Sequence, residues 1–272
     1  MSVVPDTLPR APRLVPWTGI RRPGHVVERN LTYYRRSWWI VITGAVEPLI
    51  FLLSARLGIG RLVGELPAPD GRLVSYASFV APALLASSCA NGAIYDTTFN
   101  FFHKLRYEKT YDSMLATPMA VRDVSVGELG WAICRGLVHA VLFIAVMAAL
   151  GVIASPWAVL LVPAVLVIEF AFAGLGLAAT TYVRTWRDFD WQQLIWLPMF
   201  LLSASFFPLS VYPESARWLV QITPLYQGVA LLRMLVLGGV DWTALVHVAY
   251  LVALGWLCLR HATRRMARLL LH

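Results

Sequence analysis

Residues 157–183 read WAVLLVPAVLVIEFAFAGLGLAATTYV, and Glu169 is the only Asp, Glu, Lys or Arg in this stretch. An α-helix rises about 1.5 Å per residue, so about twenty apolar residues cross the ~30 Å hydrocarbon core of a bilayer. The stretch is long enough and apolar enough to do so. It predicts a transmembrane helix, and with it a membrane fold.

The composition of the whole chain agrees with that prediction. Of 272 residues, 58% are hydrophobic and 14% are charged, whereas soluble domains have about 45–50% apolar and about 25% charged residues. The excess of apolar side chains has to face lipid. The formal net charge of +8 is then a property of the loops, and we expect no nucleic-acid partner. The three cysteines form no CxxC pair and are expected to be small buried hydrophobes.

Five further apolar stretches accompany the first. The expected fold is an all-α polytopic membrane protein with six transmembrane helices, within a single domain at 38–272. A Pro-rich arm at 1–16 is expected to be disordered. The basic segment 17–37 is expected to be an amphipathic helix in the membrane interface, with a solvated basic segment as the alternative. The six expected spans are 38–57, 76–98, 137–153, 157–183, 191–211 and 242–259.

Two features set the topology. Seventeen of the 23 Lys and Arg residues fall in the two chain ends and alternate loops, and five fall on the opposite side. Since basic residues concentrate in cytoplasmic loops, both termini are expected in the cytoplasm. Between the last two spans, residues 212–237 contain two apolar runs separated by Pro224, each too short to cross. They predict two re-entrant helices in the outer half of the membrane.

Acidic residues in or beside the spans are costly in lipid and should face protein or water. Glu47 precedes Pro48 and is expected to hold a kink. Asp96 is expected to clamp the following cytoplasmic segment. Glu128 and Arg135 lie two turns apart on one helix face, where they either pair or hold helix ends. These four residues are interpreted as structural.

Glu169 and the fifth span are the candidates for a substrate path. Glu169 is interpreted either as a polar contact or proton site in the path, or as a hydrogen-bonded strut between helices. The fifth span mixes amides, hydroxyls and rings, which suits an amphiphilic substrate, although packing at an interface explains it equally well. Its candidate residues are Gln193, Ser203, Ser205, Phe206 and Phe207. Small residues at 86–92, Gly174 and Gly176 indicate close helix packing within the chain or across a dimer.

The loop between the second and third spans carries the most informative local pattern. Residues 99–118 read FNFFHKLRYEKTYDSMLATP. Tyr107, Tyr111, Met114 and Leu115 fall on one face at helical spacing, and charged residues cover the rest. Such a face needs a partner to bury it. The partner is another protein or, alternatively, the ends of the chain's own helices.

The segment YEKTYDSMLATP at 107–118, followed by GEL at 127–129, resembles the membrane subunits of the ABC transporter type-2 (ABC-2) permease family. The similarity is nearest to the exporters of nodulation factors (lipo-oligosaccharides) and of daunorubicin-type drugs. It extends over nearly the whole chain, although Ala83 stands where the family often has Gly. The other matching blocks are EPLIFLLSARLGIG at 47–60, YASFVAPALLASS at 76–88 and FFPLSVYPESARWLVQITPLYQGVALLR at 206–233.

The resemblance implies a permease subunit of a bacterial inner-membrane exporter for an amphiphile such as a lipid, glycolipid, lipo-oligosaccharide or drug. Segment 99–118 would be the coupling helix, which docks on a separate cytoplasmic ABC ATPase present in two copies. A second permease copy, identical or a close paralogue, would complete the pathway among the membrane lipids. The implied ATPase contacts are Tyr107, Glu108, Tyr111, Asp112 and Met114.

Catalytic motifs are missing from the sequence. It contains no GxxxxGK[ST] phosphate loop, and neither of its two lysines follows a glycine. We therefore expect no cofactor on this chain, with ATP and Mg bound by the partner ATPase. No HExxH or GxSxG motif is present, so we expect a non-enzymatic subunit. The alternative is an intramembrane lipid-modifying enzyme with Glu169 or Asp96 as acid or base, and a passive channel is a third reading.

Overall fold

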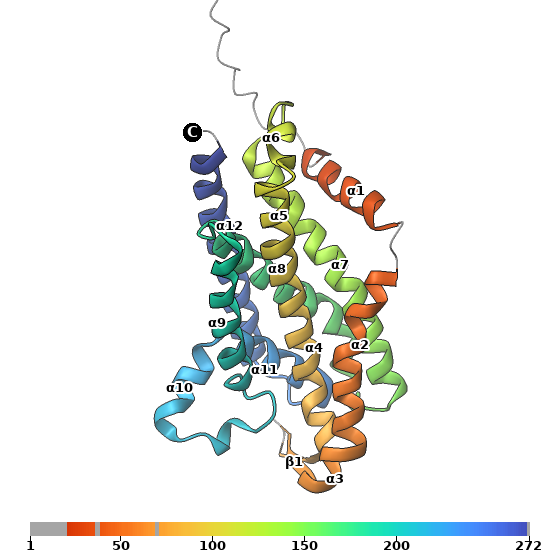
Figure 1. Cartoon of the computed structure of the whole chain (residues 1–272). Helices are drawn as coiled ribbons and strands as arrows, with labels where there is room; N and C mark the ends of the chain where they lie inside the picture. Colours follow the sequence, from red (N-terminus) through yellow and green to blue (C-terminus); the bar gives the residue numbers. More distant parts are fainter. Residues whose placement is uncertain (1–20, 36–38, 69–70, 271–272) are drawn as a thin grey trace, which may run out of the picture.

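The computed structural model describes residues 21–35, 39–68 and 71–270, which fold into a bundle of helices with one small hairpin (Figure 1). Four helical stretches are long and apolar enough to cross a membrane. They are Tyr76–Arg106, Val121–Ala149, Pro156–Thr180 and Thr243–Leu270. A bent pair of shorter helices could make a fifth span. The expected all-α membrane fold is therefore found, and within the described residues four or five of the six expected spans meet these criteria.

The chain runs through its elements in the following order. An N-terminal helix α1 (Arg21–Arg35) precedes α2 (Trp39–Ser54), a π-helical turn η1 (Ala55–Ile59) and α3 (Gly60–Val63). The antiparallel strands β1 (Glu65–Pro67) and β2 (Leu73–Ser75) pair Leu66 with Val74. Helix α4 (Tyr76–Tyr95), π-helical η2 (Asp96–Asn100) and α5 (Phe101–Arg106) then form one continuous rod, followed by α6 (Thr110–Leu115) and α7 (Val121–Ala149).

The second half contains the remaining spans. A 3₁₀ turn η3 (Pro156–Leu160) leads into α8 (Leu161–Thr180), and η4 (Trp186–Phe189) leads into α9 (Asp190–Leu201). After the short turn η5 (Leu209–Val211) come α10 (Glu214–Ile222), α11 (Pro224–Leu237) and the long α12 (Thr243–Leu270).

Small residues bring α4 and α8 together at the centre of the bundle. A Cβ on Gly176 would lie 2.1 Å from Thr97 Oγ1 and 3.2 Å from the Ile94 backbone, and a Cβ on Gly174 would lie 2.7 Å from the Gly255 carbonyl oxygen of α12. Such approaches require glycine. The interpretation of Gly174 and Gly176 as packing within the chain is confirmed. A Cβ on Gly92, in contrast, would meet nothing within 4 Å.

The fifth expected span is shorter than predicted. Helix α9 has 12 residues, or about 18 Å, and ends soon after its internal Pro198. Proline removes a helix hydrogen bond and clashes with the preceding turn. The chain then turns through Ala204, whose φ is 53°, so the predicted helix over 191–211 is wrong beyond Leu201.

The two apolar runs at 212–237 form two short helices, as expected. Helices α10 and α11 meet at 89°, and Thr223 caps α11 by accepting a hydrogen bond from the Tyr226 amide at 3.3 Å. Pro224 follows directly at the first helical position, where proline is well tolerated. How deep the pair lies in the membrane stays a prediction.

The two ends of the bundle differ in the elements they hold. Helices α1 and α6 and the C-terminal end of α12 lie at one end, and α3 and β1 lie at the other (Figure 1). The expected helix at 17–37 is found over Arg21–Arg35, where it packs on α7. The expected disordered arm at 1–16 lies outside the described residues.

Candidate functional site

The predicted coupling segment consists of two short helices separated by a turn. Helix α5 ends at Arg106, and α6 begins after Lys109, whose φ of 48° breaks the helix. At the tip, Tyr107 is 56% exposed, and Glu108 and Asp112 are also exposed. A continuous helix over 99–118 is therefore wrong, but these three residues are accessible to a partner.

Tyr111 points into the protein instead. It is fully buried, and its ring stacks on Phe101 with 4.8 Å between centroids. Met114 is half-buried and packs on the same core. Tyr111 therefore packs on the chain's own helices, as in the alternative reading, and its contact with an ATPase stays a prediction.

A buried polar cluster lies behind the coupling segment. Lys104 of α5 donates to Glu128 of α7 at 2.7 Å, and Asn30 of α1 donates to the same carboxylate oxygen at 3.2 Å. Lys104 also donates to the Asn30 side-chain oxygen at 3.2 Å. Burial and the nearby Glu128 carboxylate raise the pKa of Tyr111 well above its ordinary value. The cluster joins three helices beneath α6.

A second ion pair, farther from α6, joins the continuous helix of α4, η2 and α5 to α7. Asp96 of η2 pairs with Arg135, and Asn100 donates to Asp96 at 2.6 Å. The π-helical turn places Asp96 on the side that faces α7. Asp96 thus ties η2 to α7, and its expected role as a clamp of the coupling segment stays a prediction. Of the two alternatives for Glu128 and Arg135, the structure favours the one in which they hold helix ends, because Glu128 pairs with Lys104 and Arg135 pairs with Asp96.

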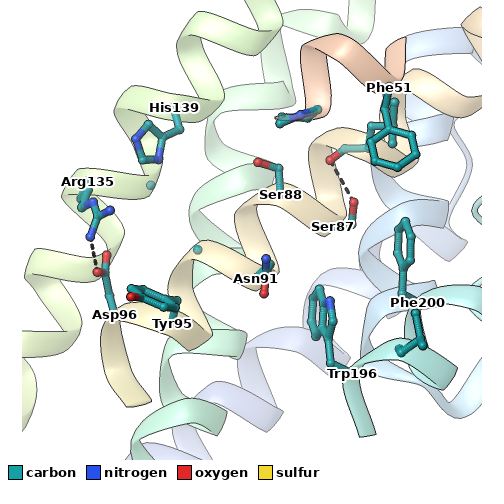
Figure 2. Close-up of a pocket in the computed structure, with 15 residues that line it drawn as sticks. Phe51, Ser87, Ser88, Asn91, Tyr95, Asp96, Arg135, His139, Trp196 and Phe200 are labelled. Atoms are coloured by element: carbon teal, nitrogen blue, oxygen red, sulfur yellow. Dashed lines mark hydrogen bonds and ion pairs between the residues drawn. The ribbon is translucent and has the colours of Figure 1, made fainter. Parts of the chain in front are cut away.

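A cavity of about 390 Å³ opens beside this ion pair, between α2, α4, α7 and α9 (Figure 2). Ser87, Ser88 and Asn91 of α4 give it hydroxyl and amide groups, and Trp196 and Phe200 of α9 form an aromatic wall. Arg135 and His139 of α7 lie along its other side. Apolar walls with a few polar groups are typical of sites that bind amphiphilic molecules.

Glu169 of α8 lies just behind the cavity wall. It has no exposed surface, and a Cβ on the cavity-lining Gly136 would lie 2.2 Å from its Oε1 atom. The thiol of Cys89 on α4 is the polar side chain that interacts with its carboxyl group. Gly136 lies between Glu169 and the cavity at this point, and both interpretations of Glu169, as a path residue and as a strut between helices, stay predictions.

Comparison with known proteins identifies the family. The family model described as ABC-2 type transporter matches residues 24–237. The chain belongs to the ABC-2 type transporter family. It is 28% identical to nodulation protein J of Sinorhizobium fredii (strain NBRC 101917 / NGR234) over 238 residues, which is 87% of each chain. It is 29% identical to nodulation protein J of Rhizobium meliloti (strain 1021) over 86% of each chain. The family assignment makes this chain a membrane subunit of a transporter, not a catalytic enzyme.

Four of the expected path residues of this ABC-2 subunit, all after α9, do not line the cavity. Ser203 and Ser205 are buried and share a 2.7 Å hydrogen bond in the turn after α9. Phe206 contacts Phe200 edge-on, whereas Phe207 is 54% exposed. The side chains of Gln193 and Glu47 lie outside the described residues.

Several residues of the candidate site could not be predicted from the sequence. Asn91 and Trp196 line the cavity, and Asn30 and Lys104 complete the polar cluster. Asn91 was visible as an amide within an apolar span. The partnership of Asn30 and Lys104 was not visible, because 74 residues separate them and only the packing of α1 on α7 brings them together. Within the described residues, no group of three or more His, Cys, Asp or Glu side chains could hold a metal ion.

Proposed function

We propose that this chain is the permease half of an ATP-driven exporter, powered by a separate ABC ATPase that docks on α5 and α6. Two ATPase copies and a second permease copy complete the complex in a bacterial inner membrane. ATP and Mg bind to the ATPase, and both termini of this chain lie in the cytoplasm, on the same side as α6.

The contact surface is the exposed tip of the coupling segment. Glu108 and Asp112 supply negative charge, and Tyr107 supplies a ring beside them. Tyr107 also stacks on Trp186 of η4, with 5.7 Å between centroids. A partner that pushes on this tip therefore acts on the loop before α9 as well as on α5.

The observation that carries the proposal is the continuous rod beneath this tip. Residues Tyr76–Arg106 are helical without a break, and the rod carries Lys104 and Asp96 at its tip end and cavity-lining Asn91 farther along. The ion pairs of Lys104 and Asp96 join the rod to α7. Movement at the tip is thus transmitted to two walls of the cavity.

The lining of the cavity supports the proposed substrate class. Its mixture of hydroxyl, amide and aromatic side chains suits an amphiphile with a polar head and an apolar body. The resemblance to exporters of nodulation factors adds lipo-oligosaccharides to the candidate substrates, beside other lipids, glycolipids and drugs. Glu169 is then a polar group that becomes accessible when α7 moves.

Co-isolation tests this function. The tagged chain is purified from its native membranes and examined for a protein with a GxxxxGK[ST] motif. We expect the wild type to retain such an ATPase and the Glu108→Arg/Asp112→Arg variant to lose it while keeping its thermal unfolding midpoint. Glu65→Arg is the matched control, because Glu65 is exposed at the opposite end. Equal retention of the ATPase by the double variant would overturn the docking site.

A further inference from the structure

A second cavity, of about 590 Å³, lies at the opposite end of the protein from the coupling segment. Helices α11 and α12 and the turn after α9 form most of its walls, and Pro67 and Ala68 close it on the hairpin side. Arg233 and His247 are among its lining residues, together with Tyr226 and Gln227, and none of its described lining residues is an Asp or Glu.

Arg233 is a basic residue that lines this cavity and is almost fully buried. It is 7% exposed, and no carboxylate pairs with it among the described residues. Its guanidinium lies 3.9 Å from the centroid of the Phe79 ring. Its Nη2 atom donates to the Ala204 carbonyl at 2.9 Å and to the Ser205 carbonyl at 3.5 Å, and its Nε atom donates to the Phe79 carbonyl at 3.4 Å.

One edge of this guanidinium is left for a ligand. No described residue accepts a hydrogen bond from Nη1, and Arg233 lines the cavity. A buried charge is costly unless it is paired, and a guanidinium binds phosphate oxygens with charge-assisted hydrogen bonds. The nearby Asp241 does not supply the missing anion, since it accepts hydrogen bonds from Thr243 and is not among the lining residues.

The rest of the cavity suits the body of an amphiphile. Phe79, Met234 and Val246 supply apolar wall, and Trp242, which is 72% exposed, also lines the cavity. Gln227 makes a hydrogen bond with His247 and adds polar groups near the head. A polar end with a cation and an apolar remainder matches a phosphate-bearing lipid-like molecule better than a free ion.

We infer that this outer cavity binds the phosphate head group of an anionic amphiphile, with Arg233 as its principal ligand. The inference rests on the proposed function in one point, namely that the cavity opens on the outer face of the membrane. Because this binding needs no ATPase, a negative lipid titration does not affect the proposed docking site. A negative co-isolation likewise does not affect this inference.

The test titrates the purified full-length chain with dioctanoyl phosphatidylglycerol and follows its thermal unfolding midpoint. We expect a rise for the wild type, and an apparent affinity weakened about tenfold or more in Arg233→Gln, as for the loss of a charge-assisted contact. Arg56→Gln is the matched control, because Arg56 also donates to a backbone carbonyl, that of Leu150 at 3.0 Å, and neither residue lines the cavity. It should respond as the wild type does.

Two further probes and one further variant make the result decisive. Dioctanoylglycerol, which lacks phosphate, and inorganic phosphate, which lacks chains, should each leave the midpoint nearly unchanged. If Arg233→Gln does not fold, Ala230→Phe fills the cavity from α11 and keeps the three carbonyl contacts of Arg233; it should abolish the response. The inference is overturned by a wild-type response in Arg233→Gln or Ala230→Phe, or by equal responses to either control probe.

Discussion

At the scale of single residues, Glu128 joins three helices at the end of the bundle that holds α1 and α6. Its side chain is 3% exposed and that of Lys104 is 14% exposed, so the two charges are largely removed from water. Removing one member of such a pair leaves the other charge buried and unpaired, which costs far more than the pair itself contributes.

Glu128→Gln is therefore expected to lower the free energy of unfolding by about 3 kcal/mol, measured by thermal or denaturant unfolding in detergent. Lys104→Met together with Glu128→Gln should cost less than the sum of the two single changes, because neither charge is then left alone. Strict additivity would show that the two residues do not interact. Glu65→Gln, at an exposed position, is the control.

Substitutions of Tyr111 distinguish a residue that packs within the protein from one that contacts the ATPase. Its ring is buried on Phe101, but its hydroxyl has no hydrogen-bond partner among the described residues. Tyr111→Phe should leave the unfolding midpoint unchanged or slightly higher, whereas Tyr111→Ala should cost about 3–5 kcal/mol by opening a cavity. A Tyr111→Ala protein that is stable and well folded but no longer binds the ATPase would show that Tyr111 belongs to the contact surface.

At the scale of elements, close approaches between helices hold the bundle together. A Cβ on Gly174 would meet the backbone of Gly255, and a backbone cannot move aside as a flexible side chain can. Gly174→Ala should thus destabilise the α8–α12 pair by about 1–3 kcal/mol. Gly92→Ala, in a membrane helix with open space around it, should be neutral or stabilising by up to ~1 kcal/mol. Similar unfolding midpoints for the two variants would contradict the packing described here.

The helices themselves could be predicted to different degrees from the sequence. Long apolar runs predicted the spans around α4, α8 and α12, because hydrophobic length alone decides them. The shortness of α9 was not predicted, because apolar residues continue past Leu201 and only the local effect of Pro198 and the turn at Ala204 ends the helix. The break at Lys109 was missed for a similar reason, since a single left-handed residue leaves no compositional signal.

Contacts between helices could be predicted least. The positions of Asp96 and Glu128 indicated structural roles, but their partners lie on other helices and were beyond any spacing argument. Burial of Tyr111 likewise depends on how α6 folds back onto α5. The exposed Glu108 and Asp112, in contrast, lie where the charged face of the segment predicted them.

At the scale of the whole molecule, the proposed ATPase contact and the proposed lipid site lie at opposite ends of the bundle. The coupling tip and its ion pairs lie at one end, and the Arg233 cavity lies at the other, with the α4–α5 rod passing beside the central cavity between them. Transport would then require the tip to move relative to α7. A disulfide or crosslink that fixes α5 to α7 should reduce export without releasing the ATPase, and both quantities can be measured on the same membranes.

The central claim is that the tip of α5 and α6 contacts a separate ATPase, and site-specific photocrosslinking tests it most directly. A photoreactive amino acid is placed at position 112, with position 65 as the control, and native membranes are irradiated before mass spectrometry of the adducts. We predict an adduct at position 112 with a protein that contains a GxxxxGK[ST] motif, and none at position 65. Adducts at position 112 that contain only lipid or other proteins would contradict the account.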